Sequence, residues 1–452
     1  MTLLNELSAE VCQRARMSRD PRFDGRFFVA VKTTGIFCRP ICPANLPKEE
    51  NVEYFSSQAL AVSAGYRPCL RCRPESAPHS WAWKGAETTF LRALTLIEQG
   101  ELDGSLETLA SRLGISDRYL RQLFQRHLGM PPKQYAQIQQ LMFAKQLLHT
   151  SQISITEVAY ASGFQSTRRF NDAFQKLFRL TPTQVRRERA ALPSRNHLSL
   201  AFRGPFDWAH MLDFYRLRAI EGMELVDEQS YQRHFVLGEG TGWFKASMAQ
   251  SHLDIEFEME RLSDLRHLVA RLRRMFDLDA DLISIEAHLE QVAPGLVRRT
   301  GIRIPGVWNA WEAGVRAVLG QQVSVKAAIG QLNLLVSTLA VSEGSTRYFP
   351  TPEQVQMSDL SFLRMPERRK ETLKRLADYV RLHPMDSPMA WLSLSGIGPW
   401  TVDYAQLRGE SRSHCFLTGD LIVKKALAKF PQLTAESVAP WGSYATFHCW
   451  SH

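Results

Sequence analysis

The sequence predicts a multidomain chain that is mostly α-helical and has smaller α+β parts. Three observations support this class. The chain has 452 residues, which is too many for a single hydrophobic core, so three or four domains are expected. Four of its seven cysteines lie between positions 38 and 72. A helical pattern also occurs twice, about fifty residues apart, between positions 106 and 182.

Composition and charge favour a globular protein with a polyanionic partner. Hydrophobic residues make up 44% and charged residues 22%, which excludes collagen-like, low-complexity and wholly disordered chains. The net charge of +9 and the pI of about 9.2 favour nucleic acid as that partner. A mildly basic protein without such a partner would carry the same charge.

The N-terminus, MTLLNELSAEVCQRAR, lacks the basic start and apolar run of a signal peptide. No stretch approaches the roughly eighteen apolar residues of a membrane span. We therefore expect a cytoplasmic protein without a membrane partner. In that reducing compartment, clustered cysteines indicate metal or redox chemistry rather than disulfides.

The clustered cysteines form two short knuckles, Cys38-x3-Cys42 and Cys69-x2-Cys72. This spacing allows two ligand pairs to close a tetrahedral thiolate site around one zinc ion. Four free buried cysteines or a redox pair are the alternatives. Spacing alone favours a purely structural zinc ligand at Cys38 over a reactive thiol.

The segments around these cysteines, VKTTGIFCRPICPA and AGYRPCLRCRPE, resemble the N-terminal domain of the Ada family of adaptive-response regulators over residues 1–78. The resemblance implies a small zinc-binding α/β domain. It also implies that Cys38, the first cysteine after TTGIF, accepts the methyl group of a methylated DNA phosphate. Zinc would keep the thiol deprotonated, and the neutral phosphotriester would not repel a thiolate.

Such a transfer has no easy reverse, so each molecule would act once. Methylating one of four zinc-bound thiolates would also change the formal charge from −2 to −1 and weaken repulsion from DNA. Of the family's phosphate-contacting positions, Thr34 and Arg67 match, whereas Pro43 and Asn45 stand where arginines are expected.

The repeated pattern comprises LETLASRLGIS (Leu106–Ser116) and SITEVAYASGFQS (Ser154–Ser166), each followed by an amphipathic helix. Each copy has Ala-x3-Gly and then a serine suited to a helix N-cap, which predicts two helix–turn–helix units. The inward-facing residues are expected to be Leu120, Leu123, Phe124 and Leu128 in the first helix, and Phe170, Phe174 and Leu177 in the second.

Residues 83–190 resemble an all-α AraC-type DNA-binding domain with a double helix–turn–helix. Arginine and glutamine can form bidentate bonds with base edges in the major groove. The outward residues that we expect to read DNA are Arg118, Arg121, Gln122, Arg168 and Arg169. A solvated helix face is the alternative for each of them.

The next region is mixed. HLDIEFEM (His252–Met259) alternates apolar and acidic residues, which predicts a half-buried strand. One apolar helix face follows, formed by Leu265, Leu268, Val269, Leu272, Met275 and Phe276.

In the C-terminal third, LSLSGIGPWTVDYAQLRG (Leu392–Gly409) predicts a hairpin at Gly396 and Gly398 whose backbone can approach a DNA phosphate. Together with FLTGDLIVKKAL (Phe416–Leu427), it resembles the AlkA-type 3-methyladenine DNA glycosylases. The resemblance implies a TATA-binding-protein-like α+β subdomain over residues 198–295 and an all-α helix–hairpin–helix glycosylase domain over residues 296–452. It also implies a monovalent cation at the hairpin.

By position, Asp420 corresponds to the family's catalytic carboxylate, and aromatic residues would hold the cationic flipped base. Trp400 stands where strand-cutting relatives carry a Schiff-base lysine, which implies a monofunctional glycosylase that uses water. The implied pocket aromatics are Phe214, Trp400, Tyr404 and Trp450, and the implied loop residues near the base are Gln321 and Gln322.

The resemblances together imply a bacterial alkylation-response protein that joins a methyl acceptor, a transcriptional activator and a glycosylase. Its expected partners are double-stranded DNA and RNA polymerase, and we expect a nucleoid-associated monomer. The cysteine motif that repairs O6-methylguanine is absent, so no such repair is expected. The main alternative is a zinc-dependent regulator whose C-terminal module only binds DNA. A zinc site that senses thiol oxidation is a further alternative.

Overall fold

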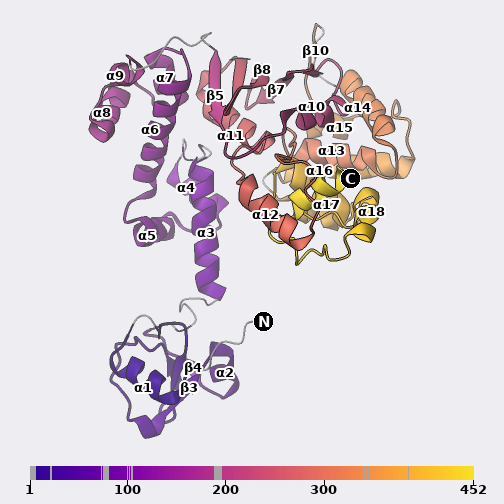
Figure 1. Cartoon of the computed structure of the whole chain (residues 1–452). Helices are drawn as coiled ribbons and strands as arrows, with labels where there is room; N and C mark the ends of the chain where they lie inside the picture. Colours follow the sequence, from indigo (N-terminus) through magenta and orange to yellow (C-terminus); the bar gives the residue numbers. More distant parts are fainter. Residues whose placement is uncertain are drawn as a thin grey trace. The chain divides into compact units, whose positions relative to one another are not determined.

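The computed structural model describes residues 7–20, 23–72, 74, 81–98, 100, 102, 105–187, 196–339, 342–344, 346–384 and 386–451. The segments between the predicted domains, around residues 73–80 and 188–195, lie almost wholly outside these ranges. The chain forms two compact units, Met1–Gln139 and Gln140–His452 (Figure 1). Within the described ranges, no helix has the length and apolar character that a membrane span requires.

The first unit begins with a small domain built on a four-stranded sheet. Its elements are α1 (Ala9–Met17), β1 (Phe28–Val31), β2 (Ile36–Cys38), η2 (Glu49–Asn51), β3 (Val52–Phe55), α2 (Gln58–Ser63) and β4 (Arg67–Pro68). The strand order is β3-β1-β2-β4, with β2 and β4 parallel and the other pairs antiparallel. Because side chains alternate along β1, Val29 packs with Cys12 on one face while Phe28 packs with Phe37 on the other.

The first helix–turn–helix follows in α3 (Trp81–Glu98), α4 (Leu106–Arg112) and α5 (Asp117–Leu128). Gly114 has a φ of +67°, and the Ser116 hydroxyl accepts a hydrogen bond from the backbone N–H of Tyr119 at 3.2 Å. The three predicted inward residues Leu120, Leu123 and Phe124 are buried, and Leu128 is half-buried. The predicted turn and N-cap are therefore confirmed here.

The second copy lies in α7 (Ile155–Ala161), α8 (Thr167–Phe178) and α9 (Pro182–Arg187), after α6 (Pro132–Thr150). Gly163 again has a positive φ, +84°, and Ser166 caps α8. The prediction for Leu177 was wrong, because this side chain is 39% exposed. Phe178, which continues the four-residue spacing of Phe170 and Phe174, packs against the core instead.

A five-stranded antiparallel sheet with the order β5-β9-β8-β7-β6 forms the predicted α+β part of the second unit. Its elements are β5 (His197–Ala201), α10 (Trp208–Arg216), β6 (Glu224–Val226), β7 (Ser230–Leu237), β8 (Gly240–Met248), β9 (His252–Met259), η4 (Leu262–Asp264) and α11 (Leu265–Met275). The apolar residues Leu253, Ile255 and Phe257 of β9 are buried, as the alternation predicted. All six residues of the predicted apolar face at α11 are buried in the same core.

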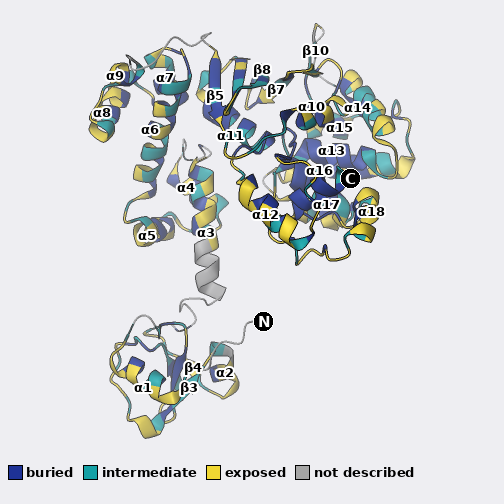
Figure 2. Ribbon diagram, in the orientation of Figure 1, coloured by how far each residue is buried: buried dark blue, intermediate teal, exposed yellow. Residues whose placement is uncertain are grey.

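The remainder is mainly helical. Its elements are α12 (Leu282–Val292), α13 (Ala310–Gly320), α14 (Val325–Leu339), β10 (Ser342–Glu343), β11 (Thr346–Arg347), α15 (Pro352–Met357), α16 (Glu367–Leu382), η5 (Pro388–Ser393), α17 (Pro399–Gly409), α18 (Leu421–Lys429) and α19 (Gly442–Trp450). Figure 2 shows buried residues concentrated along α13. A Cβ at Gly409 of α17 would lie 2.5 Å from Cα of Ala310 in α13, so this glycine allows the two helices to pack closely.

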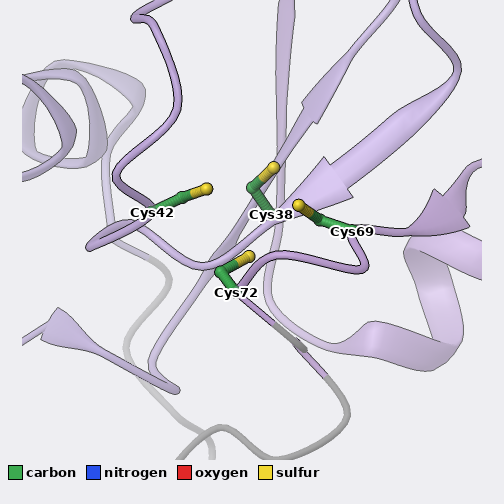
Figure 3. Close-up of side chains that lie close together, drawn as sticks. All are labelled: Cys38, Cys42, Cys69 and Cys72. Atoms are coloured by element: carbon green, nitrogen blue, oxygen red, sulfur yellow. The ribbon is translucent and has the colours of Figure 1, made fainter.

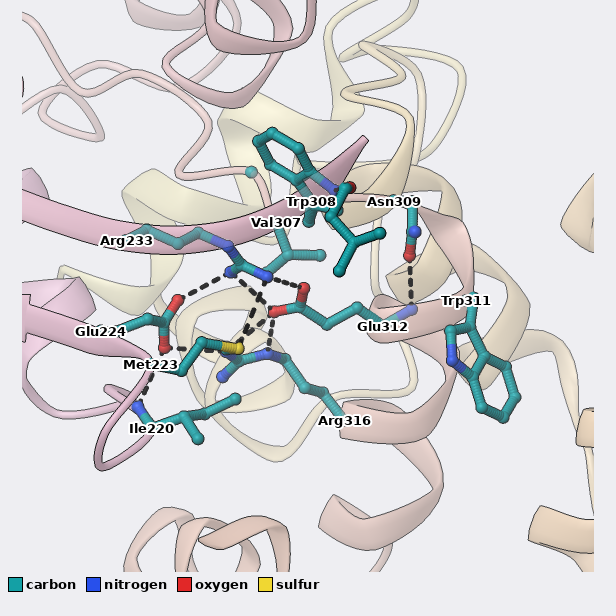
Figure 4. Close-up of polar contacts among 12 residues, drawn as sticks. Ile220, Met223, Glu224, Arg233, Val307, Trp308, Asn309, Trp311, Glu312 and Arg316 are labelled. Carbon is teal, nitrogen blue, oxygen red and sulfur yellow. Dashed lines mark hydrogen bonds and ion pairs between the residues drawn. The ribbon is translucent and has the colours of Figure 1, made fainter. Parts of the chain in front are cut away.

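A buried ion-pair network joins the sheet to α13 (Figure 4). Arg233 of β7 pairs with Glu224 of β6 at 2.8 Å and with Glu312 of α13 at 2.5 Å. Arg316, one turn further along α13, pairs with Glu312 at 2.9 Å and with Glu224 at 3.1 Å. The four side chains are at most 6% exposed, so each charge depends on its partners for stabilisation.

Candidate functional sites

The sheet of the first unit brings the clustered cysteines together. Cys38 ends β2, and Cys69 directly follows β4, which runs parallel to β2. The backbone N–H of Cys69 donates a hydrogen bond to the Phe37 carbonyl at 3.0 Å. Cys42 follows a turn closed onto the Arg39 carbonyl. The four sulfur atoms face one another and all lie within 4.8 Å (Figure 3).

These sulfur positions fit a zinc ion. With Zn–S bonds of about 2.3 Å, a tetrahedral site has sulfur–sulfur separations of about 3.8 Å, within the observed limit. The pKa of Cys72 is lowered to about 5 by its hydrogen bond with Cys38, and the pKa of Cys38 is raised by the same contact and by burial. Four thiolates at this spacing repel one another, so a divalent cation is required to hold them all ionised.

Arg39 fixes the loop of Cys72. Its backbone N–H donates to Sγ of Cys72 at 3.4 Å, and its Nη1 donates to the Cys72 carbonyl at 3.4 Å. The guanidinium also pairs with Asp24, with Nε to Oδ1 at 2.8 Å. The sequence shows Arg39 as one of several basic residues around the cysteines, but it does not indicate the contacts with Asp24 and Cys72.

Of the predicted phosphate-contacting residues, Thr34 and Arg67 are both exposed. The backbone N–H of Arg67 bonds to the carbonyl of Gly35 at 2.8 Å, so the two residues belong to adjoining segments. Cys38 is half-exposed, whereas Cys42 is buried. A substrate can therefore approach the first of these two sulfurs more readily than the second.

On the helical repeat, the five residues predicted to read DNA are all exposed: Arg118, Arg121, Gln122, Arg168 and Arg169. Arg121 is paired with Asp117 one turn earlier at 2.9 Å. Breaking this exposed pair would cost little, so Arg121 can still exchange that partner for DNA. The base-reading role of the five residues stays a prediction.

The second unit contains a cavity of about 400 Å³, which suits a small-molecule-sized group. The residues predicted for base binding and catalysis that line it are Phe214, Trp400, Tyr404, Asp420 and Trp450. Trp400 and Tyr404, one turn apart on α17, stack with ring centroids 5.3 Å apart. Phe214 and Trp450 lie nearly parallel, with centroids 6.2 Å apart and an interplanar angle of 13°. The cavity thus offers flat aromatic surfaces to a ligand.

Asp420 is the N-cap of α18. Its Oδ1 accepts hydrogen bonds from the backbone N–H groups of Ile422 and Val423 at 2.9 and 3.2 Å, and from Nε1 of Trp450 at 3.1 Å. No hydrogen bond to Oδ2 is present among the described residues. The capping bonds fix the carboxylate, and one of its oxygens stays available to the cavity.

Gln321 and Gln322 lie outside the lining of this cavity. Nε2 of Gln321 donates to the Gly396 carbonyl and to the Thr401 hydroxyl, both at 3.2 Å, so this residue ties its loop to the hairpin. Gln322 is exposed and has a φ of +58°, a left-handed conformation uncommon for residues other than glycine. The predicted placement of both residues near the base remains a prediction.

The predicted hairpin connects η5, a 3₁₀-helix rather than an α-helix, to α17. Gly396 has a φ of +94°, and a Cβ there would lie 2.1 Å from Oγ1 of Thr372. A Cβ at Gly398 would meet no atom within 4 Å. Only Gly398 therefore leaves open space that a phosphate could approach.

Sequence reasoning missed four polar residues of the cavity wall: His210, Asp213, Arg218 and Arg316. Arg218 lies four residues after Phe214, and its Cζ lies 3.7 Å from the centre of that ring. The four-residue spacing is the sequence signal that could have indicated it.

Three family models match the chain. They are described as the metal binding domain of Ada (residues 11–75), a helix-turn-helix domain (residues 109–188) and the AlkA N-terminal domain (residues 197–309). They follow one another in the order that the sequence predicted.

Curated relatives match in the same regions. A probable bifunctional transcriptional activator/DNA repair enzyme AlkA of Mycobacterium tuberculosis is 34% identical over 98% of this chain and 96% of its own. DNA-3-methyladenine glycosylase 2 of Escherichia coli is 33% identical over 56% of this chain and 96% of its own. The bifunctional transcriptional activator/DNA repair enzyme Ada of Escherichia coli is 35% identical over 38% of this chain and 47% of its own.

Proposed function

Because the chain belongs to the family of bifunctional transcriptional activators and DNA repair enzymes that combine Ada-like and AlkA-like parts, we propose that it detects and repairs alkylated DNA. The proposed division is a methyl acceptor over residues 1–78, a DNA-binding activator over 83–190, and a glycosylase over 198–295 and 296–452. Its partner is double-stranded DNA, and RNA polymerase is the partner in activation.

In the first part, Cys38 accepts a methyl group from a methylated DNA phosphate. Cys38 is half-exposed and ends β2, the strand that pairs with Arg67 of β4, and this placement supports the role. Zinc, when bound, keeps the four thiols ionised at neutral pH. The Cys38 sulfur forms a bond to the methyl carbon, the carbon–oxygen bond breaks, and the electron pair leaves with the phosphate diester. The thioether has no path back to a thiolate, so each molecule acts once.

Mass spectrometry tests this step. Exposure to duplex DNA carrying methyl phosphotriesters should add one methyl group to the peptide that contains Cys38. Because the methyl group replaces the thiol hydrogen, the mass of this peptide should rise by about 14 units. Cys42→Ser serves as a comparison because it removes a buried ligand and not the proposed acceptor. Methyl on a different cysteine, or only oxidised thiols, would contradict the assignment and favour an oxidation sensor.

In the second unit, Asp420 supports release of an alkylated purine flipped out of DNA. Its carboxylate supports this role, because three N–H donors orient it at the wall of an aromatic cavity. The glycosidic bond breaks with its electrons going to the base, and Asp420 stabilises the positive charge that develops on the sugar. Water then bonds to the sugar carbon and passes its proton to the carboxylate. No lysine lines the cavity in the described residues, which supports cleavage without strand cutting.

Asp420→Asn separates an enzyme from a module that only binds DNA. Asparagine is an N-cap as good as aspartate, so the fold should be retained. Release of methylated purines from duplex DNA should fall by a factor of 100 or more in Asp420→Asn, since loss of one electrostatic stabiliser has about this effect. Asp281→Asn, which changes the N-cap of α12 instead, is the matched control and should keep full activity. Release of no base by the unaltered protein would leave only the DNA-binding regulator.

Three finer points belong to the same proposal. The protein acts as a monomer in the cytoplasm, associated with the nucleoid. It does not repair O6-methylguanine, and methyl transfer from DNA carrying only that lesion would contradict this point. A monovalent cation at the hairpin of Gly396 and Gly398 assists phosphate binding.

A further inference from the structure

The wall of the cavity contains two arginines in different electrostatic settings. Arg316 is paired with both Glu224 and Glu312. Arg218 has no ion pair with a carboxylate among the described residues. Its only hydrogen bond there runs from Nη1 to the Phe214 carbonyl at 3.3 Å, although a guanidinium has five N–H donors. A partly buried cation with unused donors is costly unless a ligand supplies acceptors.

Two contacts hold Arg218 in position. Nη1 of Arg316 donates to the Arg218 carbonyl at 2.9 Å, which attaches the backbone here to the ion-pair network. The guanidinium lies over the face of Phe214, with Cζ 3.7 Å from the ring centre. Burial lowers the pKa of Arg218 to about 10, which still leaves it protonated at neutral pH.

The cavity is therefore polarised. Contacts run from Asp420 to Trp450 at 3.1 Å, from Trp450 to Phe214, and from Phe214 to Arg218. The carboxylate and the free guanidinium are thus separated by two aromatic rings. Asp420 and Arg218 line the same cavity, so we take the edge of the base that is farthest from the sugar as the part that meets Arg218 when the sugar carbon lies at Asp420.

We propose that Arg218 determines which base the cavity prefers, and that it favours purines with a carbonyl oxygen at C6 over purines with an amino group there. This inference rests on the proposed glycosylase function and names its substrate class. A guanidinium only donates hydrogen bonds, so it matches the O6 acceptor of a guanine-type edge, whereas N7 is an acceptor in both kinds of purine. The amino group of an adenine-type edge presents donors to it instead.

The test uses two bases that differ in this edge and share their methyl position and charge. DNA treated with a methylating agent contains both 3-methylguanine and 3-methyladenine, and chromatography measures the release of each. Arg218→Gln should lower the ratio of 3-methylguanine to 3-methyladenine release at least fivefold. Arg218→Lys keeps the charge without the forked donors and should give an intermediate ratio. Arg381→Gln removes one exposed arginine of α16 and should leave the ratio unchanged.

An unchanged ratio in Arg218→Gln, including equal loss of both activities, would overturn the inference and leave Arg218 with a role in packing alone. Binding of each free base can be measured by the quenching of tryptophan fluorescence, which reports the preference without catalysis. If the unaltered protein releases neither base but prefers the guanine-type base, and Arg218→Gln loses this preference, the inference stands and the glycosylase proposal fails. Equal binding of both bases by the unaltered protein overturns the inference.

Discussion

At the scale of single residues, buried polar groups have their ionisation set by their surroundings. Asp277 follows Phe276, the C-cap of α11, and has a left-handed conformation with a φ of +53°. It accepts hydrogen bonds from the Tyr444 hydroxyl at 3.0 Å and from the Ile304 backbone at 3.2 Å. Burial nevertheless raises its pKa to about 7. The cost of desolvating the carboxylate therefore exceeds what these donors return.

This raised pKa predicts a pH-dependent stability. The folded protein keeps the Asp277 proton up to about pH 7, whereas the unfolded chain loses it near pH 4. The stabilisation is thus fully present below pH 4 and is lost as the pH rises to about 7, by at most about 4 kcal/mol. Asp277→Asn keeps the shape and tolerates a positive φ, so it should remove this component.

Thermal unfolding at pH 5 and pH 8 measures the effect. The unfolding midpoint of the unaltered protein should fall more between these two conditions than that of Asp277→Asn. Other titrating groups are common to both proteins and cancel in the comparison. Equal falls in the two proteins would show that Asp277 is ionised throughout this range.

At the scale of elements, glycine is present at the two positions of the hairpin for different physical reasons. Gly396 combines a positive φ with contact to Thr372, whereas Gly398 begins α17 in an extended conformation with open space around it. The first glycine is required by the fold. The fold does not require the second glycine, and we propose that its role is to let a DNA phosphate approach the backbone.

This contrast predicts that the same substitution affects stability at one glycine and DNA binding at the other. Gly396→Ala should destabilise the protein by about 2 kcal/mol or more, because a Cβ clashes with Thr372 and the backbone is strained. Gly398→Ala should change the unfolding midpoint little and should weaken binding of duplex DNA, measured by fluorescence anisotropy at fixed salt. Normal DNA binding by a well-folded Gly398→Ala variant would remove the phosphate role of this position.

Local patterns explain how much the sequence could predict. The strand β9, the helix α11 and the caps at Ser116 and Ser166 each depend on spacing within one segment, and each was predicted correctly. The five cavity residues were identified only through resemblance, since they come from four separate elements. The bond from Gln321 to Gly396 depends on how distant segments pack, which no local spacing records. The same holds for Arg218, which forms no ion pair within the described part of the chain.

At the scale of the second unit, the network of Arg233, Glu224, Glu312 and Arg316 connects the sheet to the helices that carry the cavity. Two carboxylates and two guanidiniums balance in charge. Removing one partner would leave an uncompensated buried charge, which costs more than the intact network contributes.

Glu312→Gln is therefore expected to destabilise the second unit by about 3–5 kcal/mol. Glu371→Gln breaks an exposed pair with Arg375 and should cost at most about 1 kcal/mol, which makes it the matched control. Urea unfolding followed by tryptophan fluorescence compares the two variants. Because Arg316 also bonds to the Arg218 carbonyl, Glu312→Gln should in addition reduce base release below its own unfolding transition.

Because the cysteines outside the zinc site are all buried, the number of reactive thiols reports whether the zinc site is occupied. Cys12, Cys415 and Cys449 are 2%, 3% and 0% exposed, and burial raises the pKa of the last two to about 12. A colorimetric thiol reagent should therefore not reach these three cysteines in the folded protein, and after a chelator is added it should find four reactive sulfurs, those of the zinc site. After exposure to methylated DNA the same titration should stop at three. One absorbance reading would then report how many molecules in a sample have already been used.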